Sequence, residues 1–496
     1  MSQTTVIAIS LVAYKALLIL IGLWASRRVH DTTDYLLGGR NLGPWVAGLS
    51  YAASTSSAWV LLGYSGFVFS QGAVALWMLP GIWGGYIAMW LWCGPRLRAE
   101  SSERGWLTST DMIAANTARV PRRAIAVTAA LLILFCFVFY IAAQFAAAAS
   151  AFTSNFDMSF TSAVVLGAAI IVVYCLLGGF WAVSVTDMLQ GVVMAAAAII
   201  VPLATLVAAG GPSGVVDALK ANDDLVALTW HGGMAPMVVA GFAVGIASIG
   251  LGTMGQPHLM ARLMAVRGER ERRQGFAIAM TWAVVVFLGM AVLALSARAL
   301  LLDTSSGEDL FYLAAQRFLP PVLAGVVIAA VLSAVMSTVD SLLIAAAAAA
   351  SHDLGLGRRL PGGELWVSRV VMLSIAVFAV ILTLSLPDSI FNRVLFAWSA
   401  LGAAFGPTLC ARVIGREPPG WARFASMVTG FGLTVLFYSF GAVADATSLG
   451  SVGRWLYDLA HVPGDPFERM FPWIPALALV LMPKTSDVVA METDTP

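Results

Sequence analysis

Charged residues are scarce in this sequence. Asp, Glu, Lys and Arg make up 11% of its 496 residues, whereas about 25% is typical of a soluble domain. Hydrophobic residues make up 59%, which leaves too little polar surface to cover the roughly three soluble domains that this length would hold. The composition argues against a soluble protein. It also excludes intrinsic disorder, which requires low hydrophobicity and high net charge.

A surplus of one charge sign is missing as well. The 28 Lys and Arg nearly cancel the 27 Asp and Glu, so the net charge is +1, and no nucleic-acid partner is expected. The four cysteines occur without CxxC or Cys/His spacing, which argues against a disulfide framework and a zinc site. The HExxH, GxSxG and Walker A motifs are absent from the sequence. Enzymatic activity is therefore not expected.

Long apolar runs fill the chain instead. About thirteen of them are long enough to cross a bilayer as helices. The sequence therefore predicts an all-α multi-pass membrane protein with thirteen transmembrane helices. The predicted spans are 5–26, 43–69, 74–95, 124–153, 160–180, 186–209, 234–260, 274–301, 320–350, 365–386, 390–414, 421–443 and 468–483.

Most Lys and Arg residues fall in the odd-numbered loops between these spans, as in the run from Arg262 to Arg273 in loop seven. Cytoplasmic loops carry such an excess. We therefore expect an outside N-terminus and a cytoplasmic C-terminus, and we interpret the arginine clusters as orientation signals. The Thr-Ser-Thr-Asp sequence at 108–111 resembles a helix cap and predicts a short cytoplasmic helix over 107–118.

Polar or helix-breaking clusters within the spans are informative because lipid cannot satisfy polar groups. In span two, four consecutive hydroxyl residues occupy positions 54–57, and such residues permit unwinding. In span seven, four glycines precede Pro257, which predicts a break. Corresponding broken helices in two halves of a chain indicate a transporter binding site. The alternative for span two is a small-residue face for helix packing.

Two carboxylates accompany these clusters. In span nine, Ser337, Asp340 and Ser341 lie within one helical turn or so. A carboxylate within a span costs roughly 2.5–3.5 kcal/mol, so Asp340 must be paired, hydrogen-bonded or protonated, unless it reaches interfacial water from a helix end. Hard oxygen ligands without Cys or His suit a cation such as sodium. Asp187, at the predicted start of span six, reads by itself as an ordinary helix cap.

Several motifs together resemble the sodium/solute symporter family, and most closely its bacterial sodium/proline symporters. They are DYLLGGRNLGP at 34–44, LGGFWAVSVTD at 177–187, GQPHLMAR at 255–262, AVMST at 334–338 and FAWSALGAAFGP at 396–407. The resemblance implies a leucine-transporter-type fold in which spans two to six and seven to eleven form 5+5 inverted repeats. It divides the chain into an extra N-terminal helix and loop (1–42), the transport core (43–414), and two peripheral helices with a short tail (415–496).

The resemblance also implies a coupling sodium ion between spans two and nine. Its ligands would be the carbonyl oxygens of Ala53, Ser56 and Ala334 and the hydroxyls of Ser337 and Thr338. A second cation site would use Asp187, Ser337, Asp340 and Ser341. The substrate pocket would comprise Ser54, Thr55, Ser57, Tyr140, Gln144, Ile249, Thr253 and Pro257.

The sequence departs from the proline symporters within these sites. Those transporters carry Asp, Trp and Tyr where this chain has Thr55, Ile249 and Thr253, and Ser where it has Asp340. We hypothesise that Asp340 partly replaces the carboxylate missing at position 55. The resulting second site would then bind a different cation, sodium or a proton.

The sequence thus predicts a sodium-coupled symporter that works as a monomer in the lipid bilayer and imports a small organic solute, most like proline or another amino acid. One alternative is a sodium- or proton-coupled symporter for another small solute such as a monocarboxylate. Another is a transporter-like sensor that signals through a separate partner. An intramembrane enzyme is disfavoured because catalytic residue pairs are missing.

Overall fold

A computed structural model gives the fold of the chain. It describes residues 32–482 apart from short gaps at 154–155, 157, 177–178, 305, 361–362, 386–388 and 448, and four isolated residues before position 32. The predicted span 5–26 therefore lies almost entirely outside the described residues.

The described part of the chain is helical, and nine of its helical segments are long and apolar enough to cross a membrane. The first of these is a run of consecutive helices, Pro44–Glu103. It comprises α3 (Pro44–Ala58), α4 (Ser65–Gln71), α5 (Met78–Ile87) and α6 (Gly94–Glu103), joined by short π- and 3-10-helical turns. The others are α8 (Arg119–Thr153), α10 (Phe180–Ala208), α12 (Pro236–Ala247) with the 3-10 segment η6 (Ser248–Gly255), α14 (Glu269–Ala299), α16 (Pro321–Ala348) with η8 (Ala349–Asp353), α18 (Gly363–Ser385), α19 (Ile390–Val413) and α20 (Gly420–Gly441).

Shorter helices lie between or after these segments. They are α2 (Thr32–Leu37), α7 (Ser109–Ala114), α9 (Phe160–Cys175), α11 (Gly211–Ala221), α13 (Pro257–Ala265), α15 (Leu310–Phe318), α17 (Leu356–Arg359), α21 (Ser451–Ala460), α22 (Pro466–Arg469) and α23 (Trp473–Leu481). The short helix predicted over 107–118 is confirmed as α7, and its cap is a capping box between Thr108 and Asp111.

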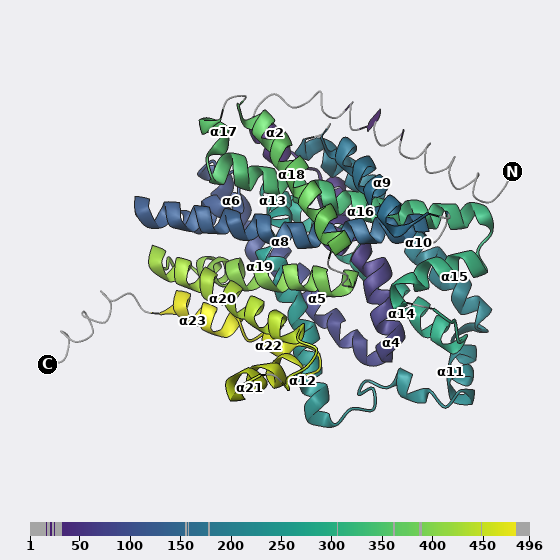
Figure 1. Ribbon diagram of the computed structural model, residues 1–496. Coiled ribbons are helices and arrows are strands. Elements are labelled where there is room, and N and C mark those ends of the chain that lie inside the picture. Colours follow the sequence, from purple (N-terminus) through teal and green to yellow (C-terminus); the bar gives the residue numbers. More distant parts are fainter. Residues whose placement is uncertain are drawn as a thin grey trace.

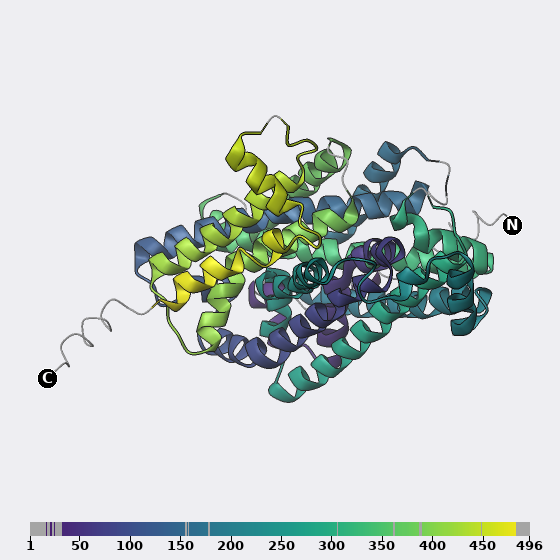
Figure 2. The same cartoon turned by 90° about the horizontal axis from the view of Figure 1, so that it is seen from below.

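Two helices occupy the centre of the bundle. In the most apolar stretch of α16, 83% of the residues are buried, and in α19 94% are buried, against 28% in α20. Helices α20 to α23 form one flank of the molecule, in yellow-green and yellow in both views (Figures 1 and 2). Large apolar side chains such as Val173, Val207 and Phe378 remain exposed on the outer helices. Such an apolar exterior is suited to lipid.

Both predicted helix breaks are confirmed. Inside α3, Ser57 has φ 51° and ψ −171°, which interrupts the helix at the last residue of the hydroxyl cluster. In span seven, α12 passes into η6, and the extended Gln256 then separates η6 from α13. The glycines of η6 also permit close packing, because a Cβ on Gly250 would come within 1.8 Å of the carbonyl oxygen of Gly81 on α5.

The structure differs from the predicted spans at three places. Spans two and three are one helical run that turns at Gly72, which has φ 77°. The helix predicted over 160–180 ends at Cys175. The last predicted span, 468–483, is represented by the nine-residue α23 preceded by α22. Pro472 and Pro475 lie where a continuous helix would have to start, and proline removes a backbone donor.

Candidate functional site

The interrupted part of α3 lies against α16. The hydroxyl of Ser54 donates to the carbonyl oxygen of Ser337 at 3.1 Å. The segments that carry the predicted sodium ligands, 53–56 on α3 and 334–338 on α16, are therefore brought together. All five predicted ligand residues are buried, at 0–1% exposure.

One hydroxyl at this junction is unsatisfied by the protein. Among the described residues, Thr338 Oγ1 has no hydrogen-bond partner, whereas Ser337 Oγ donates to the carbonyl oxygen of Ala334 at 3.1 Å. The side chain of Ser56 lies beside Tyr86 on α5, so the predicted ligand from Ser56 is its carbonyl oxygen. A buried hydroxyl without a partner costs free energy, so the oxygen atom of Thr338 has an unmet capacity to coordinate an ion.

The predicted second cation site contains a guanidinium group of the protein itself. Nη2 of Arg262, on α13, lies 2.6 Å from Oδ2 of Asp187 on α10. The arginine also donates to the hydroxyls of Ser50 at 2.7 Å, Ser54 at 2.7 Å and Ser341 at 2.5 Å. Both charged side chains are buried, at 1% and 0% exposure. Arg262 thus neutralises Asp187 in a site that four elements build.

Asp340 lies at the edge of this ion pair. Ser341 donates to Oδ1 of Asp340 at 3.3 Å and to the carbonyl oxygen of Ser337 at 2.7 Å. In the described part of the chain, Oδ1 of Asp187 and Oδ2 of Asp340 accept no hydrogen bond. Asp340 is close enough to Asp187 and Arg262 to interact with both electrostatically. Two carboxylates therefore share one guanidinium.

Two interpretations of these carboxylates are wrong. Asp187 does not cap a helix, because α10 begins at Phe180 after the cap residue Gly179 and Asp187 lies two turns further in. Asp340 does not reach interfacial water from a helix end, because it is 0% exposed in the interior of α16. The sequence predicts only an orientation signal at Arg262, whereas the structure buries its side chain inside the site.

The residues predicted for the substrate pocket separate into groups. The hydroxyl of Tyr140 on α8 faces the side chains of Ser57 and Trp398. Oε1 of Gln144 accepts a hydrogen bond of 3.3 Å from the backbone N–H of Ala58, the residue after the break. Ser57, Tyr140 and Gln144 therefore surround the break in α3.

The remaining predicted substrate residues lie elsewhere. Ser54 belongs to the Arg262 cluster. Thr55 donates to the carbonyl oxygen of Tyr51 at 2.6 Å, within its own helix. Ile249 and Thr253 are buried in η6, which packs against α5 and α19. Pro257 lines a different cavity, described next.

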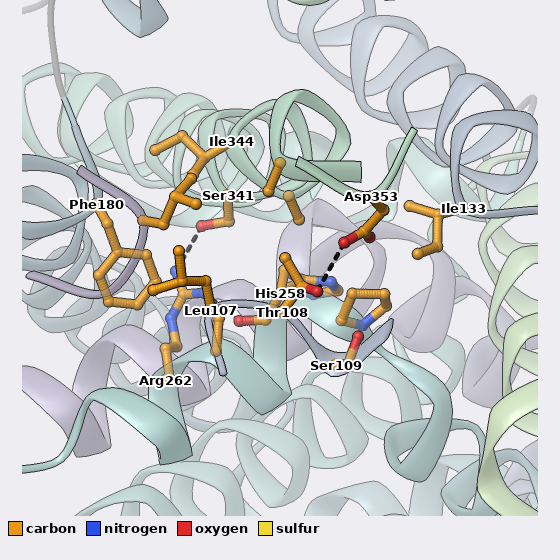
Figure 3. A pocket seen from close by; sticks show the side chains of 15 residues that line it. Leu107, Thr108, Ser109, Ile133, Phe180, His258, Arg262, Ser341, Ile344 and Asp353 are labelled. Atoms are coloured by element: carbon orange, nitrogen blue, oxygen red, sulfur yellow. Dashed lines mark hydrogen bonds between the residues drawn. The ribbon is translucent and has the colours of Figure 1, made fainter. Parts of the chain in front are cut away.

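A cavity of about 30 Å³ leads away from the Arg262 cluster. Arg262 and Ser341 lie on one side and Asp353 lies on the other, with Thr108 and His258 between them (Figure 3). Two hydrogen bonds mark these sides, Arg262 to Ser341 at 2.5 Å and Thr108 to Asp353 at 2.8 Å. This volume is large enough to hold a water molecule beside the buried cluster, on the side of α7.

Broken helices that face buried polar groups within a membrane bundle are characteristic of secondary transporters. Comparison with known proteins narrows this class. Residues 35–414 match the Sodium:solute symporter family, and the chain belongs to that family. It is a transporter and not an enzyme, and in this sodium-coupled family the ion is a transported substrate rather than a cofactor.

Similar proteins are bacterial proline transporters. The sodium/proline symporter of Escherichia coli (strain K12) is 30% identical over 494 residues, which covers 95% of this chain and 96% of that protein. A high-affinity proline transporter of Bacillus subtilis (strain 168) is 29% identical over 432 residues, covering 86% and 90%. The structure also resembles that of a Na⁺-coupled sialic acid symporter, with a TM-score of 0.71 and 15% identity over 95% of this chain and 97% of that one. That likeness shows a shared fold.

Proposed function

We propose that this chain imports a small organic solute, most like proline or another amino acid, together with sodium. One observation carries the proposal: the interrupted α3 meets α16 beside a buried hydroxyl that the protein leaves unsatisfied, on Thr338. With the carbonyl oxygens of Ala53, Ser56 and Ala334 and the hydroxyl of Ser337, it would form an all-oxygen donor set that suits sodium. The proline-transporting relatives support an amino-acid substrate.

The substrate carboxylate would bind at the break in α3. The backbone N–H groups that follow a break carry the positive end of the helix dipole and attract anions. At present Gln144 occupies the N–H of Ala58. A carboxylate would displace Oε1 of Gln144 from this N–H and accept a hydrogen bond from its Nε2, which has no partner among the described residues. Tyr140 and Ser57 would contact the rest of the solute.

The second cation site would be centred on Asp340 rather than on Asp187. Arg262 already supplies the positive charge that Asp187 requires. Asp340 leaves one negative charge uncompensated, and a sodium ion or a proton would neutralise it. The two oxygen atoms without hydrogen-bond partners, Oδ1 of Asp187 and Oδ2 of Asp340, are the natural ligands. We propose Ser337 and Ser341 as further ligands, so that Arg262 acts as a fixed cation beside an exchangeable one.

The proposed topology completes this mechanism. We propose thirteen transmembrane helices with an outside N-terminus and a cytoplasmic C-terminus, and a 5+5 inverted-repeat core over 43–414, acting as a monomer. The arginine-rich loops support this orientation, and the family match over 35–414 supports the extent of the core. The bacterial relatives support a location in the cytoplasmic membrane.

Transport by purified protein in liposomes tests this function. An inward sodium gradient should drive the accumulation of labelled proline or of another member of a panel of amino acids and monocarboxylates. A potential of 100 mV contributes about 2.3 kcal/mol per charge moved, so one sodium ion supports roughly fiftyfold accumulation. Uptake that proceeds equally well without any cation gradient would contradict the proposal.

Asp340→Asn tests the second site. The change removes the uncompensated charge while retaining the side-chain shape. We therefore expect one cation fewer, sodium or a proton, to be transported with each substrate molecule. The measurement is the ratio of charge moved to substrate moved, with Thr434→Val on the peripheral α20 as a control. An unchanged ratio together with unchanged sodium and pH dependence would exclude Asp340 from coupling.

A further inference from the structure

A second cluster of titratable side chains lies at the far end of the cavity from Arg262. It joins α7 to the end of the α16 segment. Nε2 of His352 lies 3.0 Å from Oδ2 of Asp111, and Thr108 donates to Oδ1 of Asp353 at 2.8 Å. One donor atom from each of Asp111, His352 and Asp353 lies within 4.8 Å of the other two. Neither the family match nor the proposed transport mechanism uses this cluster.

The three side chains offer ligands that suit a divalent metal ion of intermediate softness. One imidazole and two carboxylates are ligands that zinc and similar ions accept. Zinc–ligand bonds of 2.0–2.2 Å place neighbouring tetrahedral ligands about 3.3 Å apart. His352 and Asp111 already have nearly this separation, and the third ligand atom requires only a small shift. Three protein ligands would leave one coordination position for water.

The surroundings admit such an ion. A cavity of about 220 Å³ borders the three side chains. The side chains of Asp111 and His352 are 18% and 19% exposed, so the ion has a path from solvent. Thr110 also lines this cavity, and its buried hydroxyl has no hydrogen-bond partner within the part of the chain that the structure describes. That hydroxyl can accept a hydrogen bond from a metal-bound water.

Positive charges near the cluster lower its affinity for a divalent cation. Arg122 and Arg358 line the same cavity and partly offset the negative charge. We accordingly expect weaker binding than in a structural zinc site.

We propose that Asp111, His352 and Asp353 form a binding site for a divalent metal ion such as Zn²⁺, which clamps α7 to the end of the α16 segment. Asp353 lines both this cavity and the one that leads to Arg262. A bound ion would therefore hold in place one wall of the cavity that leads to Arg262. Metal binding itself does not depend on the proposed transport activity.

Zinc binding to the purified full-length protein tests the site directly. Titration against a metal-sensitive dye should show one Zn²⁺ per chain, and Zn²⁺ should raise the melting temperature. His352→Gln and Asp353→Asn should each weaken binding by about tenfold or more and abolish the thermal shift. His231→Ala, in a loop outside the cluster, should change neither. Two ligand variants guard against one that fails to fold, and each must elute as a single species before titration.

The other outcomes count against the site. Equal zinc binding by wild type and both ligand variants would show that the ion binds elsewhere, for instance at the buried cysteines. The absence of a thermal shift at saturating Zn²⁺ would show that no clamp forms. A transport assay with Zn²⁺ on each side of the membrane can follow, but a negative result there would concern regulation and not the metal site.

Discussion

The two regions predicted to bind cations differ in how far the protein satisfies them. At the junction of α3 and α16, the groups are neutral, and the hydroxyl of Thr338 lacks a partner within the described residues. At the junction of α10 and α13, Asp187 is bound to Arg262, and the arginine makes further hydrogen bonds to Ser50, Ser54 and Ser341. The first region therefore has an oxygen that an ion from solution could use, whereas in the second the protein itself supplies a cation for Asp187.

If the proposed sodium site is correct, this difference separates an exchangeable cation from a fixed one, the guanidinium of Arg262. A buried ion pair, by contrast, is costly to break because each partner would leave the other uncompensated. Asp340 lies between the two regions, since Ser341 links it to the ion pair and the helix of Asp340 also carries Ser337 and Thr338. Through Asp340, an ion that binds at one region would change the electrostatic environment of the other.

The largest expected effect comes from breaking the ion pair. Arg262→Met leaves Asp187 buried without a counter-charge, which should cost about 3–5 kcal/mol of folding free energy. Unfolding in detergent with increasing denaturant measures this loss. The double variant Arg262→Met/Asp187→Asn removes both charges and should recover much of the stability. If the double variant is no more stable than Arg262→Met, the pair is not the stabilising unit.

The next effect concerns the proposed sodium site. Thr338→Val removes one oxygen ligand from an ion but no charge from the fold, so the half-saturating sodium concentration should rise roughly tenfold. Folding stability should change little, in contrast to Arg262→Met. Thr434→Val is the matched control, because Thr434 is buried but donates to Gly430 in its own helix. An unchanged sodium requirement in Thr338→Val would remove Thr338 from the site.

The sequence was sufficient for the breaks that create the first region. Consecutive hydroxyl residues and a glycine-rich segment before Pro257 are local signals, and both produce interruptions where they occur. The positions of α7 and its capping box were also predictable, because a cap involves residues three apart. Such features depend on neighbours along the chain.

The ion pair could not be found in this way. Asp187 and Arg262 are 75 positions apart, and nothing local distinguishes Arg262 from the arginines that follow it. Only the packing of α13 against α3 and α16 turns it inward. The same limitation applies to Ser54, which the sequence associates with its neighbours at 55–57 but which the fold directs towards Arg262. The division of the hydroxyl cluster between two sites is a tertiary property.

A smaller effect is expected at the substrate end of α3. Gln144→Ala removes one amide donor beside the N–H of Ala58, so the KM for a carboxylate substrate should rise about threefold, with kcat little changed. The half-saturating sodium concentration should stay within error of wild type, because Gln144 is not among the proposed ion ligands. A KM that is unaltered for the carboxylate substrate would place its carboxylate elsewhere.

The smallest effect should follow from an ion pair that resembles the buried one in chemistry but not in burial. Arg298 and Asp224 make a two-pronged contact at 2.5 Å and 2.9 Å, yet their side chains remain 23% and 25% exposed. Asp224→Asn should cost about 0.5 kcal/mol of folding free energy, and added salt should diminish the difference. Denaturant unfolding at low and high salt, with Arg262→Met measured in parallel, compares the two pairs directly. If Asp224→Asn destabilises the protein as much as Arg262→Met does, burial does not account for the contrast between an exposed and a buried pair.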